Sequence, residues 1–208
     1  MSATVTPIHF QPPEVPEDEA RAGYYALLAR LFYSGPDAQL LSAITGADEM
    51  ADDGVRSAVG EAWNGLAAAA QAMEPEPAKL EYDALFVGTG KAEVTPYASY
   101  YLAQTGREKI LVRLRTELGE LGLSRVPGAR EPEDHFAGLL DVMRHLILQG
   151  SDDAALQKQQ VFFTRYLQPS YKGFCDAVCA SPKSNFYKHV ARFASAFFVV
   201  EAEALKVF

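Results

Sequence analysis

Apolar residues in this chain recur at intervals of three and four positions, which is the spacing of one face of an α-helix. The cleanest run is Phe136, Leu139, Leu140, Met143, Leu146 and Ile147, which Gly150 ends. No segment alternates apolar and polar residues as a half-buried strand does. The sequence therefore predicts an all-α fold, a single-domain helical bundle of roughly eight to ten helices.

Similar apolar runs predict the other helices, and Ser or Thr residues just before several of them are candidate N-caps. The expected caps are Thr105, Ser151, Ser170 and Ser184. Residues 91–101 contain Pro96 and three tyrosines and fit neither a helix nor a strand, so we expect an irregular segment there. Predicted helices cover 24–32, 37–44, 55–73, 77–86, 105–121, 136–149, 151–167, 170–179 and 186–208.

The length of 208 residues fits one compact domain. Residues 1–18 carry Pro7, Pro12, Pro13 and Pro16 and predict a flexible lead-in, followed by one folded domain over 19–208. The formal net charge of −8 argues against nucleic acid as a partner and favours a cationic one. No apolar run is long enough for stable membrane insertion, and no secretory signal is evident, so a cytoplasmic location is expected.

The sequence contains few candidates for metal or nucleotide chemistry. Cys175 and Cys179 could join His189 or His145 as zinc ligands, but both lie on an apolar helix stripe, where cysteine acts as a small hydrophobe. Gly88-Thr89-Gly90 lacks the third glycine of a dinucleotide loop and more readily ends a helix. We expect no metal and no cofactor.

The segment Glu131-Pro132-Glu133-Asp134-His135 is the most informative part of the chain. One interpretation is a helix start, with Pro132 as the first helical residue and the acids in the first turn. That interpretation leaves His135 unexplained, because a cationic imidazole is disfavoured at a helix N-terminus. A catalytic Asp134–His135 pair is not favoured, because adjacent helix residues point about 100° apart. No catalytic residues are predicted.

Three motifs resemble those of the TorD/DmsD/NarJ chaperones in order and spacing. They are Tyr82-x-x-Leu85-Phe86-x-Gly88, Pro96-Tyr97-x-Ser99-x-Tyr101 and Glu131-Pro132-x-Asp134-His135. The resemblance extends over roughly residues 20 to 205, and the third motif is its most specific part. It implies a TorD-like helical fold and a cytoplasmic chaperone that performs no covalent chemistry.

The resemblance also implies a partner, the precursor of a molybdopterin-containing oxidoreductase with its twin-arginine leader, which such chaperones hold until cofactor is inserted. The implied peptide-binding residues are Asp134, His135, Glu131, Pro132, Tyr97, Leu85, Phe86 and Tyr82. Asp134 could accept guanidinium hydrogen bonds while the apolar residues bury the rest of the leader. Core packing is the alternative role for Tyr82, Leu85 and Phe86.

Two other functions remain open at this point. One is a helical scaffold or assembly protein without a peptide groove. The other is a weak nucleotide-binding hydrolase that uses Asp134, His135 and the Gly88-Thr89-Gly90 loop. The sequence does not name the client, and it is compatible with a monomer or a domain-swapped dimer.

Overall fold

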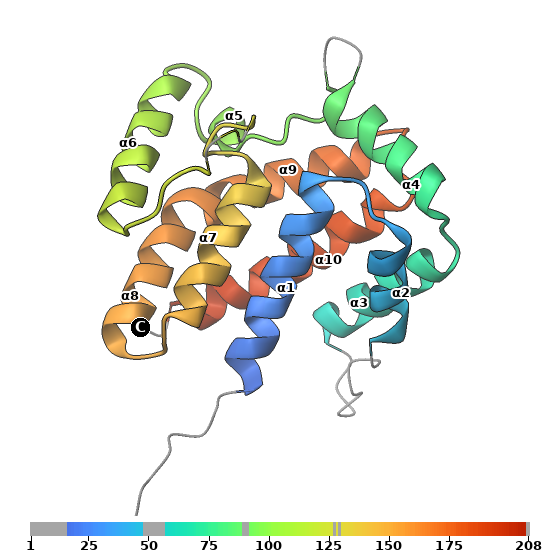
Figure 1. Ribbon diagram of the computed structural model, residues 1–208, viewed down its shortest axis with the longest axis horizontal. Coiled ribbons are helices and arrows are strands. Elements are labelled where there is room, and N and C mark those ends of the chain that lie inside the picture. The colour runs from blue at the N-terminus through green and yellow to red at the C-terminus, as the bar shows by residue number, and fades with distance from the viewer. Residues whose placement is uncertain (1–15, 48–56, 89–91, 127, 129, 207–208) are drawn as a thin grey trace, which may run out of the picture.

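The computed structural model describes residues 16–47, 57–88, 92–126, 128 and 130–206. Within these ranges the chain forms ten α-helices, and the all-α prediction is confirmed. Two π-helical segments, η1 (Asp83–Val87) and η2 (Phe163–Leu167), continue α4 and α8. The α-helices in Figure 1 are α1 (Pro16–Tyr33), α2 (Ala38–Gly46), α3 (Ala58–Gln71), α4 (Pro75–Tyr82), α5 (Ala98–Leu102), α6 (Arg107–Glu120), α7 (Phe136–Leu148), α8 (Asp153–Phe162), α9 (Gln168–Ala180) and α10 (Tyr187–Ala204).

The centre of the bundle is built from α1, α7, α9 and α10. Helix α1 packs along α7, and α10 packs against both α9 and α3 (Figure 1). The apolar stripe predicted on α7 is buried throughout, and Phe136 at its start stacks on Phe174 of α9 with ring centroids 4.1 Å apart. Burying one such side chain stabilises the fold by about 1.5–3 kcal/mol, so α7 is firmly anchored.

The predicted boundaries fail mostly at helix starts. Gly106, with a φ of 73° in the left-handed region, occupies the N-cap position of α6, so Thr105 is not its cap. Asp152, not Ser151, caps α8 by accepting the Ala155 N–H at 2.8 Å. Ser170 lies inside α9, because η2 joins α8 to α9 without a break. Local propensity alone does not place these starts.

The start of α10 is capped from a distant part of the chain, not by Ser184. The carboxylate of Glu81 in α4 accepts backbone N–H groups from Asn185 at 2.7 Å, Phe186 at 3.0 Å and Tyr187 at 2.8 Å. A carboxylate at this position satisfies otherwise unpaired donors and complements the helix dipole. This contact joins α4 to α10 across more than a hundred residues of sequence.

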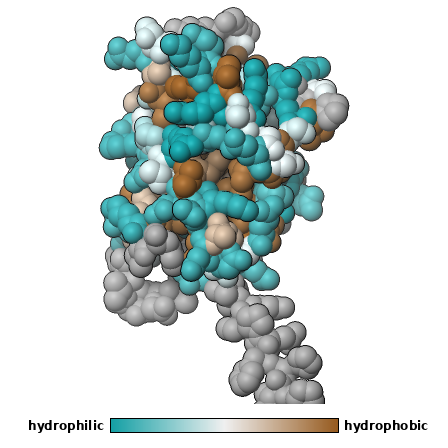
Figure 2. Space-filling model, turned by 90° about the vertical axis from the view of Figure 1, so that its left-hand side faces the viewer, coloured by the Kyte–Doolittle hydropathy of each residue, from teal (hydrophilic) through white to brown (hydrophobic). Residues whose placement is uncertain are grey.

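The predicted lead-in lies largely outside the described part of the chain, which starts with α1 at Pro16. None of the described helices is long and apolar enough to cross a lipid bilayer. The face that carries α6 and α8 is mostly hydrophilic, with a few apolar residues near its middle (Figure 2). A small hollow of about 250 Å³ lies between these two helices.

Candidate functional site

Two of the motifs singled out in the sequence meet at a crossing of two chain segments. Tyr97 and His135 form an isolated antiparallel bridge. The Ala98 N–H donates to the Asp134 carbonyl oxygen at 2.8 Å, and the Phe136 N–H donates to the Pro96 carbonyl oxygen at 2.9 Å. These bonds hold the start of α5 beside the start of α7. The segment expected to be irregular thus ends in a short helix whose position is fixed by the Glu131–His135 segment.

Asp134 caps α5 and does not face solvent. Its Oδ2 accepts the Ser99 backbone N–H at 3.2 Å, and the residue is only 2% exposed. Its Oδ1 is buried and has no hydrogen-bond partner among the described residues. In this conformation Asp134 therefore supports the crossing and does not present its carboxylate to a ligand.

His135 caps the adjacent helix, α7. Its Nδ1 accepts the Ala137 N–H at 3.2 Å, a role that requires an unprotonated Nδ1. Burial lowers the pKa of His135, although Glu131 and Asp134 oppose this shift. The rings of Tyr97 and Tyr33 flank the imidazole at centroid distances of 5.5 and 6.3 Å. The helix begins at Phe136 and not at Pro132, and the neutral imidazole explains a histidine at a helix start.

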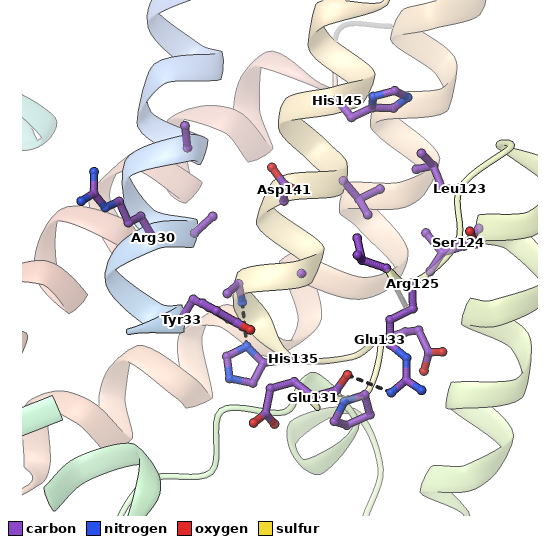
Figure 3. A pocket seen from close by; sticks show the side chains of 18 of the residues that line it. Arg30, Tyr33, Leu123, Ser124, Arg125, Glu131, Glu133, His135, Asp141 and His145 are labelled. Carbon is purple, nitrogen blue, oxygen red and sulfur yellow. Dashed lines mark hydrogen bonds between the residues drawn. The ribbon is translucent and has the colours of Figure 1, made fainter. Parts of the chain in front are cut away.

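An open cleft of about 780 Å³ lies beside this crossing, between α1, α7 and residues 123–126, 128 and 131–133 (Figure 3). Among the predicted residues, Glu131, Pro132 and His135 line it. The floor is made of small or short side chains. Because these side chains occupy little volume, the space between the two helices stays open. The floor residues are Ala26 and Ala29 of α1 and Ala137, Gly138 and Val142 of α7.

Charged side chains surround the cleft, and most are held by other groups of the protein. Glu131 Oε2 accepts the Tyr97 hydroxyl at 2.6 Å. Burial and this hydrogen bond raise the pKa of Tyr97 to about 12, so its hydroxyl stays a donor at neutral pH. Glu133 pairs with Arg115 of α6 at 3.0 Å. These two contacts attach the Glu131–Glu133 side of the cleft to the start of α5 and to α6.

Tyr82, Leu85 and Phe86 are buried in the core and do not line the cleft. The Tyr82 hydroxyl donates to the carbonyl oxygen of Tyr33 at 2.6 Å, at the last residue of α1. Phe86 packs edge-on against Phe32 with ring centroids 6.2 Å apart. These residues support the end of α1 that carries Tyr33, a cleft residue more than half exposed.

The sequence did not identify the α1 wall of the cleft. Arg30 and Tyr33 line it, as do Asp141 and His145 of α7. The helical spacing of Arg30 and Tyr33, and of Asp141 and His145, is compatible with one face, but exposed polar residues at helical spacing are the norm. The sequence does contain small residues on α1 and on α7 that face each other across the cleft. Their meaning can be recognised only when it is known that these two helices pack together.

The other candidate sites gain no support. Among the described residues, no group of three or more His, Cys, Asp or Glu side chains could hold a metal ion. Cys175 is buried and Cys179 is exposed. Gly88 ends η1, and Thr89 and Gly90 lie outside the described residues. Asp134 and His135 each cap a different helix, so they do not form the hydrogen-bonded pair that a hydrolase would need.

The fold and the cleft define an all-helical protein with a preformed groove at the start of a central helix. Residues 52–176, well over half of the chain, match the family described as nitrate reductase delta subunit. The chain belongs to this family.

Two relatives named Chaperone protein TorD illustrate the similarity. The protein from Photobacterium profundum is 29% identical over 143 aligned positions, which cover 62% of this chain and 66% of that relative. The protein from Shewanella loihica is 27% identical over 222 aligned positions, covering 92% and 96%. The match thus spans just under two thirds of the first relative and nearly all of the second.

A solved structure supports the fold. It comes from Archaeoglobus fulgidus and is described, provisionally, as a redox enzyme maturation protein. Its TM-score is 0.54 at 21% identity, over 94% of this chain and 98% of that one. At this identity the likeness concerns the arrangement of helices and not the ligand.

Proposed function

We propose that this chain is the dedicated cytoplasmic chaperone of one molybdenum-cofactor oxidoreductase. It binds the precursor through its twin-arginine leader, its catalytic subunit or both, and promotes cofactor insertion before export or assembly. Membership of the family supports the general role. The observation that carries the peptide-binding part is the open cleft, whose rim contains Glu131, Pro132 and His135 of the most specific motif.

The cleft has the chemistry that a basic and apolar peptide requires. Its floor of small aliphatic residues can receive apolar side chains, and its rim offers carboxylates to cations. The roles of the predicted residues then divide. Glu131, Pro132 and His135 contact the peptide, Tyr97 orients Glu131, and Asp134 holds the crossing. Tyr82, Leu85 and Phe86 support the α1 wall from the core.

Filling the cleft tests the proposal. A Cβ added at Gly138 would meet only the Glu133 carbonyl oxygen, at an ordinary contact distance of 3.6 Å, so Gly138→Phe should fold and place a ring in the cleft. Gly119→Phe on the exposed face of α6 is the matched control, because nothing lies within 4 Å of its Cβ. Binding of the client's leader, followed by fluorescence anisotropy, should weaken at least tenfold in Gly138→Phe and stay unchanged in Gly119→Phe.

Two results would contradict the proposal. The first is that neither the leader nor the catalytic subunit binds the wild-type chain and that the client matures normally after deletion of the gene. The second is that Gly138→Phe binds as the wild type does, which would favour the scaffold alternative without a peptide groove. Light scattering of the same preparations decides between a monomer and a dimer.

A further inference from the structure

Three carboxylates line the cleft, and two of them are already engaged. Glu131 accepts a hydrogen bond from the Tyr97 hydroxyl at 2.6 Å. Glu133 is paired with the Arg115 guanidinium at 3.0 Å, and its side chain is mostly buried. A ligand cation would have to compete with these contacts or share the carboxylate with them. Neither residue is a freely available acceptor.

Asp141 differs from both. Its side chain is 70% exposed, and its nearest cation is Arg144, one turn along α7, with a nitrogen–oxygen distance of 3.6 Å that is too long for a good hydrogen bond. Figure 3 shows Asp141 on the α7 wall, between the His135 end of the cleft and His145. It lies six positions after His135, which corresponds to a rise of about 9 Å along a helix. It is the least engaged acid of the lining.

Two arginines and a histidine of the lining already contact other groups of the protein. The Arg30 guanidinium pairs with Asp37 at 2.5 Å, outside the lining. Arg125 donates from a guanidinium nitrogen to the Glu131 carbonyl oxygen at 3.2 Å. The imidazole of His145 lies 2.7 Å from the side-chain amide of Gln149. Asp141 thus places an exposed carboxylate above the apolar floor in the middle of the cleft, 3.6 Å from Arg144.

We propose that Asp141 is the residue that selects a basic side chain in the client peptide. Its carboxylate accepts a guanidinium of the peptide, while the small apolar residues next to that arginine lie over Ala29 and Gly138. Asp134 does not perform this role, because it is buried and caps α5. This inference rests on the proposed function of the cleft. It identifies the partner as a peptide in which a cation is followed by small apolar side chains.

The test removes one charge without changing side-chain size. Asp141→Asn is compared with Asp176→Asn, a matched control on α9 that is 65% exposed, pairs with Lys172 within its own helix and lies outside the cleft lining. The probes are the client's leader and a version in which both arginines are replaced by glutamine. Asp141→Asn should weaken binding of the natural leader about two- to fivefold, as expected for an exposed ion pair. Binding of the glutamine version should not change.

The possible outcomes distinguish an error in the assignment of Asp141 from an error in the proposed function of the cleft. If the natural leader binds the wild type and Asp141→Asn equally well, the assignment of Asp141 is wrong while the cleft remains the binding site. If Asp176→Asn weakens binding as much as Asp141→Asn, overall charge and not a specific contact is responsible. If the leader does not bind the wild type, the assignment of Asp141 fails, and the proposed function then stands only if the catalytic subunit binds the wild type.

Discussion

At the scale of single residues, Asp134 and His135 divide the work of capping between two helices. Asp134 accepts from the Ser99 N–H at the start of α5, and His135 accepts from the Ala137 N–H at the start of α7. Adjacent residues can do this because the bridge at the crossing turns their side chains toward different helices. The sequence showed that this pair was unusual, but only the crossing shows why both side chains are needed.

Removing the Asp134 carboxylate should therefore reduce stability. In Asp134→Ala the Ser99 N–H keeps its buried position without its side-chain acceptor, a loss of about 1–3 kcal/mol. Urea unfolding followed by circular dichroism measures this change. Asp141→Asn is the control and should leave the unfolding midpoint unchanged, because Asp141 is exposed. If Asp134→Ala is as stable as the wild type, Asp134 does not stabilise the fold by capping α5.

The neutral His135 cap predicts a dependence of stability on pH. Burial lowers its pKa in the folded state below the ordinary value of 6.5, so between the two values the unfolded chain binds more protons than the folded one. Stability is therefore present above about pH 6.5 and is lost as the pH falls from there toward the lower folded pKa. Each unit of depression contributes about 1.4 kcal/mol.

His135→Asn should keep the cap and remove this titration, since asparagine is among the best N-cap residues. Urea unfolding at pH 7.5 and 5.5, values about one unit to either side of the ordinary histidine pKa, should show a smaller acid-induced loss in the variant. His189, whose pKa burial also lowers, is present in both proteins and cancels in the comparison. Equal losses in the two proteins would show that His135 does not titrate in this window.

At the scale of helices, apolar spacing predicted the elements well and their ends poorly. The stripe on α7 could be predicted because each of its members is buried against a neighbouring helix. The start of α10 could not, because its cap comes from Glu81, far away in sequence. The π-helical segment η2 keeps α8 and α9 continuous past Ser170, where local propensity favours a new start. Helix ends depend on tertiary contacts that periodicity does not contain.

The Glu81 cap makes a prediction at this scale. Glu81→Ala leaves the N–H groups of Asn185, Phe186 and Tyr187 without their shared acceptor and should lower the free energy of unfolding by about 1–3 kcal/mol. Glu81→Gln, which keeps one acceptor oxygen but loses the charge that complements the helix dipole, should lose less. Chemical denaturation compares both variants with Glu76→Ala, which removes an exposed carboxylate of the same helix. Losses as small as that of Glu76→Ala would show that α10 does not need the cap.

At the scale of the whole molecule, the first and last helices are joined by a buried ion pair. The Arg21 guanidinium of α1 donates to both carboxylate oxygens of Glu201 in α10, at 2.8 and 2.9 Å. The Tyr25 hydroxyl donates to the same carboxylate at 3.1 Å. Because α1 also forms one wall of the cleft, this contact links the C-terminal end of the chain to the geometry of the candidate site. This pair could not be predicted from the sequence, because 180 residues separate the partners.

Breaking this pair tests whether the predicted single domain over residues 19–208 unfolds as one unit. Glu201→Ala leaves the mostly buried Arg21 guanidinium without its main partner and should cost about 3–5 kcal/mol. Arg21→Met combined with Glu201→Leu should recover much of that loss, because a buried ion pair can be replaced by apolar residues at little cost. If the chain is one domain, far-ultraviolet circular dichroism and Trp63 fluorescence should report a single coincident transition in each variant. A different result would contradict this. If Trp63 fluorescence in Glu201→Ala changes at a higher denaturant concentration than circular dichroism does, α1 and α10 belong to a unit that unfolds independently of α3.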